Sequence, residues 1–478
     1  MSELPDSWVL VQLGVLGAWG SGGTPKRTNN RYYAAEGIPW LVIGDLNDRV
    51  VVKSSNFITE LGLQNSSAKL LPVGTLLVAM YGSIGKLGIN GIECATNQAI
   101  AFCQPNDAIV GLRYLYHALF NAKPKLLALG QGGAQQNISQ SVLKEFQVAL
   151  APKNEQTRIA NQLDTLLTRV QACNDRFDAI PALLKRFRQT VLDAAVSGSL
   201  SEDWRLSRGQ AQASTGPRHV TKDLPEGWSW SCAEEIKATD RHALAIGPFG
   251  SSLKVSDYTE EGVPLVFVRE IRSRRFSGGN TKFISLQKAR ELKAHSIQGG
   301  DLLITKMGDP PGDVAIYPSD APLAVITADC VRLRVDDTVA LAAFVGYTIV
   351  CTDTRTRLRD ITAGVAQRKI SLSRFRHFPL PLAPLSEQAE IVRRVETLFA
   401  MVDLIEARCT SARTQAQRLT PLVLAKAFRG ELVTQDPNDE PASELLASIA
   451  SSDTPVAGKN KRKVPVALKE RAKKAIKL

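Results

Sequence analysis

A long internal repeat is the feature that most constrains the fold. Sliding the sequence along itself by 232 positions aligns residues 134–200 with residues 366–432 without a gap. LAPKNEQ (150–156) returns as LAPLSEQ (382–388), and AQQNIS (134–139) as AQRKIS (366–371). Upstream the likeness is patchy, although LPDSW (4–8) is answered by LPEGW (224–228). Since 478 residues also exceed what a single core usually organises, the chain reads as two copies of one unit.

Each well-matched segment predicts a long helix. Apolar or small residues alternate at spacings of four and three after Pro152, which is typical of a coiled-coil seam. The predicted seam of the first copy comprises Ile159, Leu163, Leu166, Val170, Cys173, Phe177, Ile180, Leu184, Phe187, Val191 and Ala194. The second copy keeps this register from Ile391 to Val423. We expect Gly198 and Gly430 to stop the helices, and Pro181 and Pro421 to kink or locally break them.

Two such seams favour packing of one helix on the other, and the pairing is expected to be antiparallel because the domain between the helices leaves one and enters the next. The variable parts mix short β-rich runs, such as GTLLVAMYG, with helical patterns such as LRYLYHALF. The predicted fold class is therefore α+β: two mixed α/β domains joined by two long antiparallel helices in an intramolecular coiled coil, with a pseudo-twofold repeat. The expected boundaries are 1–152 for the first domain, 153–200 for the first helix, 201–221 for a linker, 222–384 for the second domain, 385–432 for the second helix and 433–478 for a tail, disordered from 453.

The charge points only weakly to a nucleic-acid partner. The formal net charge is +12, but Lys459 to Leu478 hold nine Lys or Arg and one Glu, so most of the excess lies in the tail. Such a tail is either a non-specific phosphate contact or a solubilising segment. The seven cysteines are scattered without C-x-x-C spacing, and no signal peptide or membrane-spanning run is evident, so we expect a cytoplasmic protein.

Motifs for catalysis are incomplete. GSGGTP lacks the third glycine of a dinucleotide fingerprint, and AMYGSIGKL has Met80 and Leu87 where a P-loop needs Gly and Ser or Thr. GDPPGD resembles the (D/N)PP(Y/F/W) motif of adenine methyltransferases, but Gly312 replaces the aromatic residue. The five histidines show no metal-ligand spacing. We therefore expect no catalytic residue and no metal site.

The motifs LAPKNEQTRIANQLDTLLTRV, LAPLSEQAEIVRRVETLFAMVDLIEA and LVLAKAFRGEL, in this order around two variable domains, resemble the specificity (S) subunit of type I restriction-modification enzymes, most closely the type IA branch. This resemblance implies that each variable domain is a target-recognition domain reading one half of a bipartite, asymmetric site in double-stranded DNA. It implies that the helices set the spacer between the halves and dock two modification (methyltransferase) subunits. S-adenosylmethionine, ATP and Mg then belong to the modification and restriction (translocase/nuclease) subunits, with no cofactor in this chain.

Glycine-flexed loops rich in amides and cations are the candidate DNA contacts under this resemblance, because Gln and Asn pair with adenine and Arg and Lys with guanine. The candidates for the first half-site are Lys26, Arg27, Tyr81, Lys86, Gln135, Gln136 and Asn137. Those for the second are Ser251, Ser252, Lys254, Arg269, Arg272, Lys306, Gln367, Arg368 and Lys369. Two alternatives remain open at this point: a self-sufficient DNA methyltransferase, which would need the missing motifs, and a coiled-coil scaffold without DNA contact.

Overall fold

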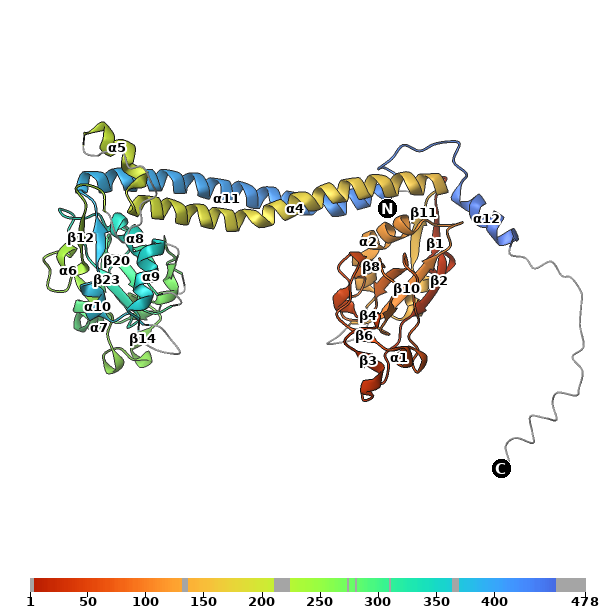
Figure 1. The fold of residues 1–478 in the computed structure, drawn as a ribbon, viewed down its shortest axis with the longest axis horizontal. Coiled ribbons are helices and arrows are strands. Elements are labelled where there is room, and N and C mark those ends of the chain that lie inside the picture. Colours follow the sequence, from red (N-terminus) through yellow and green to blue (C-terminus); the bar gives the residue numbers. More distant parts are fainter. Residues whose placement is uncertain are drawn as a thin grey trace, which may run out of the picture. The chain divides into compact units, whose positions relative to one another are not determined.

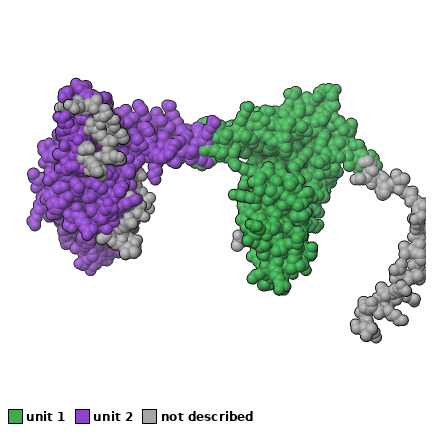
Figure 2. Space-filling view, in the orientation of Figure 1, with its two compact units in different colours: residues 1–175, 413–478 green, residues 176–412 purple. Residues whose placement is uncertain are grey.

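The computed structural model describes residues 4–130, 136–209, 224–272, 275–279, 282–308, 311–362 and 369–452. The chain forms two compact units (Figure 2). The first unit comprises residues 1–175 and 413–478, and the second unit residues 176–412. Both boundaries fall inside the long helices α4 (Lys153–Val196) and α11 (Leu385–Ala427), so each unit holds a part of both helices.

The first unit is built on a five-stranded sheet of order β2-β10-β7-β8-β5. Figure 1 labels β2, β10 and β8 of this sheet. Every residue of the central strand β7 (Leu76–Ala79) is buried, since its alternating side chains face two cores. Leu76 and Val78 pack with α2 (Leu112–Ala128), whereas Leu77 and Ala79 pack toward Leu41 and Leu71. The remaining helices and strands are β1 (Val9–Gln12), β2 (Gly17–Ser21), β3 (Tyr33–Ala34), β4 (Ile38–Leu41), β5 (Arg49–Val51), β6 (Phe57–Ile58), β8 (Leu87–Asn90), β9 (Ala95–Thr96), β10 (Ile100–Pro105), β11 (Gln147–Leu150), α1 (Glu60–Gln64), α3 (Gln140–Glu145) and α12 (Ala442–Ser452).

The second unit repeats this plan around a sheet of order β13-β23-β20-β21. Figure 1 labels β23 and β20 of this sheet. Its central strand β20 (Leu302–Thr305) is again buried on both faces, with Leu302 and Ile304 against α8 (Ala342–Val350) and Leu303 in a separate core. The other elements are β12 (Ser229–Ser231), β13 (Leu244–Ile246), β14 (Tyr258–Thr259), β15 (Val263–Val266), β16 (Ile271–Arg272), β17 (Arg275–Phe276), β18 (Phe283–Ile284), β19 (Ser296–Ile297), β21 (Val314–Ile316), β22 (Ala324–Ile326), β23 (Cys330–Leu333), β24 (Leu380–Leu382), α6 (Ala233–Ile236), α7 (Leu286–Glu291), α9 (Thr352–Asp360) and α10 (Leu372–Arg376).

Strand pairing confirms the duplication where sequence likeness was patchy. β1 pairs with β11 as β12 pairs with β24, both antiparallel. The smaller sheet β3-β6-β4-β9 corresponds to β14-β18-β15-β22, and each contains one parallel pair, β4 with β9 and β15 with β22. The two domains therefore share a common core topology, as the predicted fold class requires, although β5 of the first unit and β19 of the second have no matching strand among the described residues.

Helix pairing is antiparallel within each unit. In the first unit Ile159 and Leu163, early in α4, pack with Leu424 and Ala427, late in α11. In the second unit Leu192 and Ala195, late in α4, pack with Val395 and Phe399, early in α11. Seam residues of α4 that contact a domain core are buried, as at Ile159, Leu163 and Val191. Cys173 and Phe187 are exposed, because two helices alone cannot enclose the side chains of a seam.

Both helices continue through their prolines, so the expected local break is wrong. Pro181 lies inside α4 and Pro421 inside α11, and both are exposed. A proline removes one helical hydrogen bond, and at an exposed position water can satisfy the carbonyl that loses its donor. The expected stops are confirmed, since Gly198 and Gly430 both follow their helices with φ of +75°.

The repeated Glu of LAPKNEQ and LAPLSEQ forms a buried carboxylate site in each unit. In the first unit the Trp8 indole donates to Glu155 Oε2 at 3.0 Å, and Gln435 Nε2 donates to Oε1 at 2.5 Å. Burial raises the pKa of Glu155, and these two hydrogen bonds oppose the rise. The site therefore joins the start of α4, the N-terminal strand region and the segment that follows α11.

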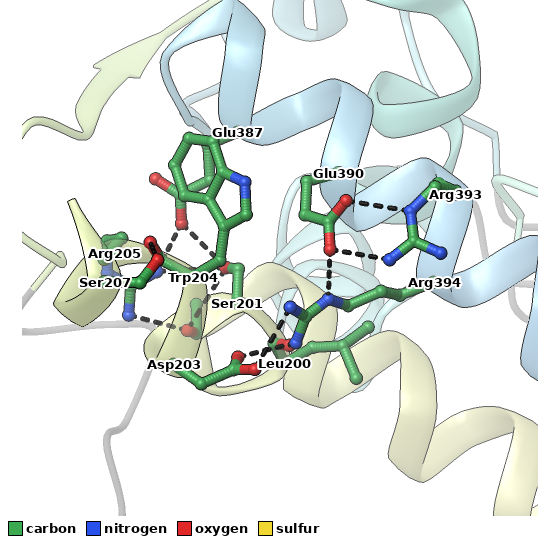
Figure 3. A network of polar contacts seen from close by, with 11 residues as sticks. Leu200, Ser201, Asp203, Trp204, Arg205, Ser207, Glu387, Glu390, Arg393 and Arg394 are labelled. Atoms are coloured by element: carbon green, nitrogen blue, oxygen red, sulfur yellow. Dashed lines mark hydrogen bonds and ion pairs between the residues drawn. The ribbon is translucent and has the colours of Figure 1, made fainter.

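The second unit contains the equivalent site around Glu387. The Trp228 indole donates to Oε2 at 2.9 Å, and Ser201 Oγ donates to Oε1 at 2.7 Å. Arg205, from α5 (Glu202–Ser207), pairs with the same oxygen, and both side chains are 2 % exposed (Figure 3). α5 lies in the segment expected as a linker, of which residues 210–221 fall outside the described part of the chain.

The repeated Gln forms a second set of matched contacts. Gln156 Oε1 accepts from Gly111 N at 3.0 Å, and its Nε2 donates to the carbonyls of Ile109 and Ala151. Gln388 Oε1 accepts from Leu341 N at 2.8 Å, and its Nε2 donates to the carbonyls of Val339 and Ala383. Each Gln thus provides hydrogen-bond partners for the backbone N–H and C=O groups just before α2 or α8.

Arg205→Ala should strongly destabilise the second unit. Removing one partner of a buried ion pair leaves Glu387 without its charge partner, at a cost of about 3–5 kcal/mol. Arg208→Ala is the matched control: it is exposed and lies over the Trp204 ring, so its removal should cost under about 1 kcal/mol. Denaturant unfolding followed by circular dichroism measures both. Equal midpoints for the two variants would contradict a structural role for the Arg205–Glu387 pair.

Candidate nucleic-acid interface

The loops that carry the first group of candidates meet at one edge of the five-stranded sheet. β2 and β7 end at this edge, and β10 begins there, because both are antiparallel to β10. Main-chain bonds join the loops: Gly22 N to Ile100 O at 3.2 Å, Met80 N to Ala99 O at 2.8 Å, and Ile138 N to Met80 O at 2.9 Å. The loops after β2 and β7 and before β10 and α3 therefore form one connected surface.

The second unit reproduces this edge bond for bond. Gly247 N donates to Cys330 O at 3.1 Å, Lys306 N to Asp329 O at 2.8 Å, and Ile370 N to Lys306 O at 3.0 Å. The isolated bridge between Tyr81 and Asn137 has its counterpart between Met307 and Lys369. Lys306 thus stands where the first unit has Met80, and Lys369 stands where it has Asn137.

Most of the described first-group candidates are brought together. Tyr81 bridges Asn137, and Gly82 N donates to the carbonyl of Gln136 at 3.0 Å. Gln136 and Asn137 are exposed, and Tyr81 is half-buried. Lys86 closes the same turn, with Nζ 3.4 Å from the carbonyl of Ile43.

The other first-group candidates lie apart from this group or outside the description. Lys26 and Arg27 are exposed in the loop after Pro25, whose carbonyl accepts from the Tyr33 hydroxyl at 2.6 Å. They therefore lie beside the smaller sheet. Gln135 lies outside the described residues.

The second-group candidates divide between the edge and its surroundings. Lys306 and Lys369 lie together at the edge, and Ser251 and Ser252 are exposed in the loop after β13. Lys254 is exposed beyond that loop, where its backbone N donates to the Asp257 carboxylate at 2.7 Å. Arg269 lies over the Phe267 ring at 4.5 Å, near β16, which contains Arg272. Gln367 and Arg368 lie outside the described residues.

Sequence reasoning missed a groove in the second unit. The groove, of about 1500 Å³, is lined by Met307 at the sheet edge, by Arg269 and by Arg188 of α4, among others. Arg188 donates to Asp403 and Glu406 of α11, each at 2.7 Å, and Arg275 also pairs with Asp403. Only the fold brings these residues together, since no local motif links positions so distant in the chain.

Sequence reasoning also passed over Phe249, which is 58 % exposed beside Lys306. The candidates were chosen for hydrogen-bonding side chains, so an aromatic residue in the same loop was not selected. The position of GPFGSS directly after a strand was the available signal. Among the described residues, no group of three or more His, Cys, Asp or Glu has a metal-binding arrangement, and no helix is long and apolar enough to cross a bilayer.

Comparisons with known proteins agree with the duplicated plan. The family model described as "Type I restriction modification DNA specificity domain" matches residues 5–180 and 269–411, more than half of the chain. The EcoKI specificity subunit of Escherichia coli K12 is 26 % identical over 96 % of this chain and 98 % of its own length. The EcoBI specificity subunit of Escherichia coli is 28 % identical over 96 % of this chain and 94 % of its own length.

Solved structures share the fold. A chain from a study of complex assembly and conformational transition in the type I R-M system aligns with TM-score 0.64 at 17 % identity, covering 90 % of this chain and 100 % of that chain. The HsdS subunit of Thermoanaerobacter tengcongensis aligns with TM-score 0.55 at 17 % identity, covering 90 % and 98 %.

Gly22→Ala should disrupt the first sheet edge. A Cβ at Gly22 would lie 2.1 Å from the Thr96 carbonyl oxygen and 2.4 Å from that of Asn97, so the backbone would have to shift. Such overpacking typically costs about 1–3 kcal/mol. Gly44→Ala is the control, because nothing lies within 4 Å of its added Cβ. Thermal unfolding should separate the two variants, and equal stability would show that the loops are not held as tightly as these contacts indicate.

Proposed function

The chain belongs to the type I restriction-modification specificity subunits, which give these systems their DNA sequence specificity, and from this premise we propose that each domain reads one half of a bipartite, asymmetric site in double-stranded DNA. The observation that carries the proposal is the duplication of the sheet edge. One topology presents its loops through the same main-chain bonds in both units, while the side chains at matching positions differ. Two sheet edges that share a backbone arrangement but carry different side chains suit two different half-sites.

Side chains at the two edges have the chemistry of base reading; Gln136, Asn137 and Lys369 are exposed and Lys306 is half-buried. Gln136 and Asn137 in the first unit can pair bidentately with adenine N6 and N7. Lys306 and Lys369 in the second unit can contact guanine O6 and N7 or a phosphate. We propose that the remaining candidate residues of each group, including those beyond the described part of the chain, contribute around these edges.

The long helices would set the spacer between the half-sites and dock two modification subunits. Docking is supported by apolar side chains that the helices leave exposed. Leu183 and Phe187 of α4 are 49 % and 44 % exposed and lie on one helix face at i, i+4 spacing. Met401 and Leu404 of α11 are likewise 56 % and 53 % exposed. Exposed apolar surface of this kind is typical of subunit interfaces.

In this proposal the chain itself is non-catalytic and acts in the cytoplasm. Methyl transfer from S-adenosylmethionine and ATP- and Mg-dependent translocation and cleavage would belong to the modification and restriction subunits. The incomplete nucleotide and methyltransferase motifs support this division of labour.

Exchanging residues 1–150 for the equivalent domain of a related specificity subunit should change one half of the methylated motif. The other half should stay the same, because the second domain has its own core and its own sheet edge. Methylome sequencing of cells expressing the exchanged chain with its modification subunit measures the motif. The reciprocal exchange of residues 222–384 is the control, and changes in both halves after either exchange would contradict independent reading.

Leu404→Lys should weaken docking of the modification subunit. A charge in the middle of an apolar interface loses its hydration, so the fraction of modification subunit that co-purifies with the chain should fall several-fold. Leu323→Lys is the matched control, because Leu323 is 55 % exposed in a loop of the same unit. Equal co-purification of both variants would exclude this helix face from the interface.

A further inference from the structure

Phe249 is a large apolar side chain held in the open at the sheet edge of the second unit. It is 58 % exposed, in the loop that follows β13. The loop is fixed on both sides of the ring. A Cβ at Gly247 would lie 2.1 Å from the Thr327 carbonyl oxygen, and Ser252 N donates to the Phe249 carbonyl at 3.0 Å. The loop therefore presents the ring from a defined backbone.

A lysine side chain lies over this ring, and a second lysine is bridged to the neighbouring residue. Lys306 Nζ lies 4.7 Å from the ring centroid, a cation–π contact. Lys369 is paired through its backbone with Met307, the next residue along from Lys306. Burial lowers the pKa of Lys306, repulsion from Lys369 lowers it further, and Asp329 opposes both. Two ammonium groups and one exposed aromatic ring thus share a small surface.

This combination suits DNA better than a protein face. An exposed ring gains little for the stability of its own domain, whereas a base pair offers a thymine methyl group in the major groove and the backbone offers phosphate for the lysines. The cluster also occupies the same edge that presents Gln136 and Asn137 in the first unit. A protein partner would need an acidic surface around an apolar pocket to match it.

We propose that Phe249 is a specificity-determining DNA contact of the second domain, its ring packing against a base of the second half-site while Lys306 and Lys369 hold the adjoining phosphates. The inference rests on the proposed function and deepens it, because it assigns a role to a residue outside the hydrogen-bonding candidates. Lys306 also positions the ring through their cation–π contact.

Phe249→Ala in the full chain, assembled with its modification subunit, tests the inference. The probes are a duplex carrying the methylated motif of the wild-type complex and a second duplex with base changes in one half only. We expect binding to the first duplex to weaken roughly 5- to 150-fold, the range typical of losing the specific contacts to one base pair, and discrimination to fall in the second half-site alone. Phe249→Tyr retains the ring, so it should keep both the binding and the discrimination of the wild-type complex. Val255→Ala is the matched control, since Val255 is 79 % exposed in the same domain.

The outcomes separate this inference from the proposed function. If the wild-type complex prefers its motif and Phe249→Ala behaves like Val255→Ala, the Phe249 contact is overturned and the proposed function stands. If Phe249→Ala lowers co-purification of the modification subunit but leaves sequence preference intact, the ring contacts protein and the inference also falls. If the wild-type complex shows no sequence preference, the proposed function fails and the inference with it.

Discussion

Two buried carboxylates organise the chain, because a charged group without water needs hydrogen-bond donors from its surroundings. Glu155 and Glu387 each sit in the first turn of a long helix, where the helix dipole favours negative charge. Each takes one donor from a tryptophan directly before the first strand of its domain and another from the segment that follows the opposite helix. In each unit one carboxylate therefore connects the first turn of one long helix, the residues before the first strand of the domain and the residues that follow the other long helix.

The two sites reach this result with different charges. Glu387 is matched by Arg205, so the second unit buries an ion pair, whereas Glu155 accepts from the neutral Gln435. Both donors also bond the carbonyl of the helix-stopping glycine, Gly198 for Arg205 and Gly430 for Gln435. The second unit's site is further held by Arg394, which contacts Asp203 of α5 and Glu390 of its own helix (Figure 3). The two carboxylate sites therefore share the arrangement of their hydrogen bonds but differ in the charge of the donor side chain.

The sequence predicts those parts of the fold that leave a periodic or a repeated pattern of residues. The helices, their glycine stops and the duplicated domains follow from spacing and from the aligned copies. It was insufficient where contacts join distant residues: the pairing of LPDSW with LAPKNEQ at Trp8 and Glu155 has no local pattern, and the continuity of α4 through Pro181 depends on exposure that a sequence does not state. Of the candidate DNA contacts, the structure groups Tyr81 with Asn137 and places Lys306 beside Lys369, but it separates Lys26 and Lys254 from those edges.

The sheet edges are joined by backbone amides and carbonyls, and a peptide group makes such bonds whatever side chain it carries. Met80 and Lys306 fill the same structural position, as do Asn137 and Lys369, and the bonds around them are unchanged. At the exposed positions Asn137 and Lys369 a substitution therefore alters the surface chemistry and leaves these backbone bonds in place, whereas Met80 is buried in the core of the first unit. If these exposed positions read DNA as proposed, such a chain acquires a new recognition sequence by point mutation, one domain at a time, and keeps the ability to fold.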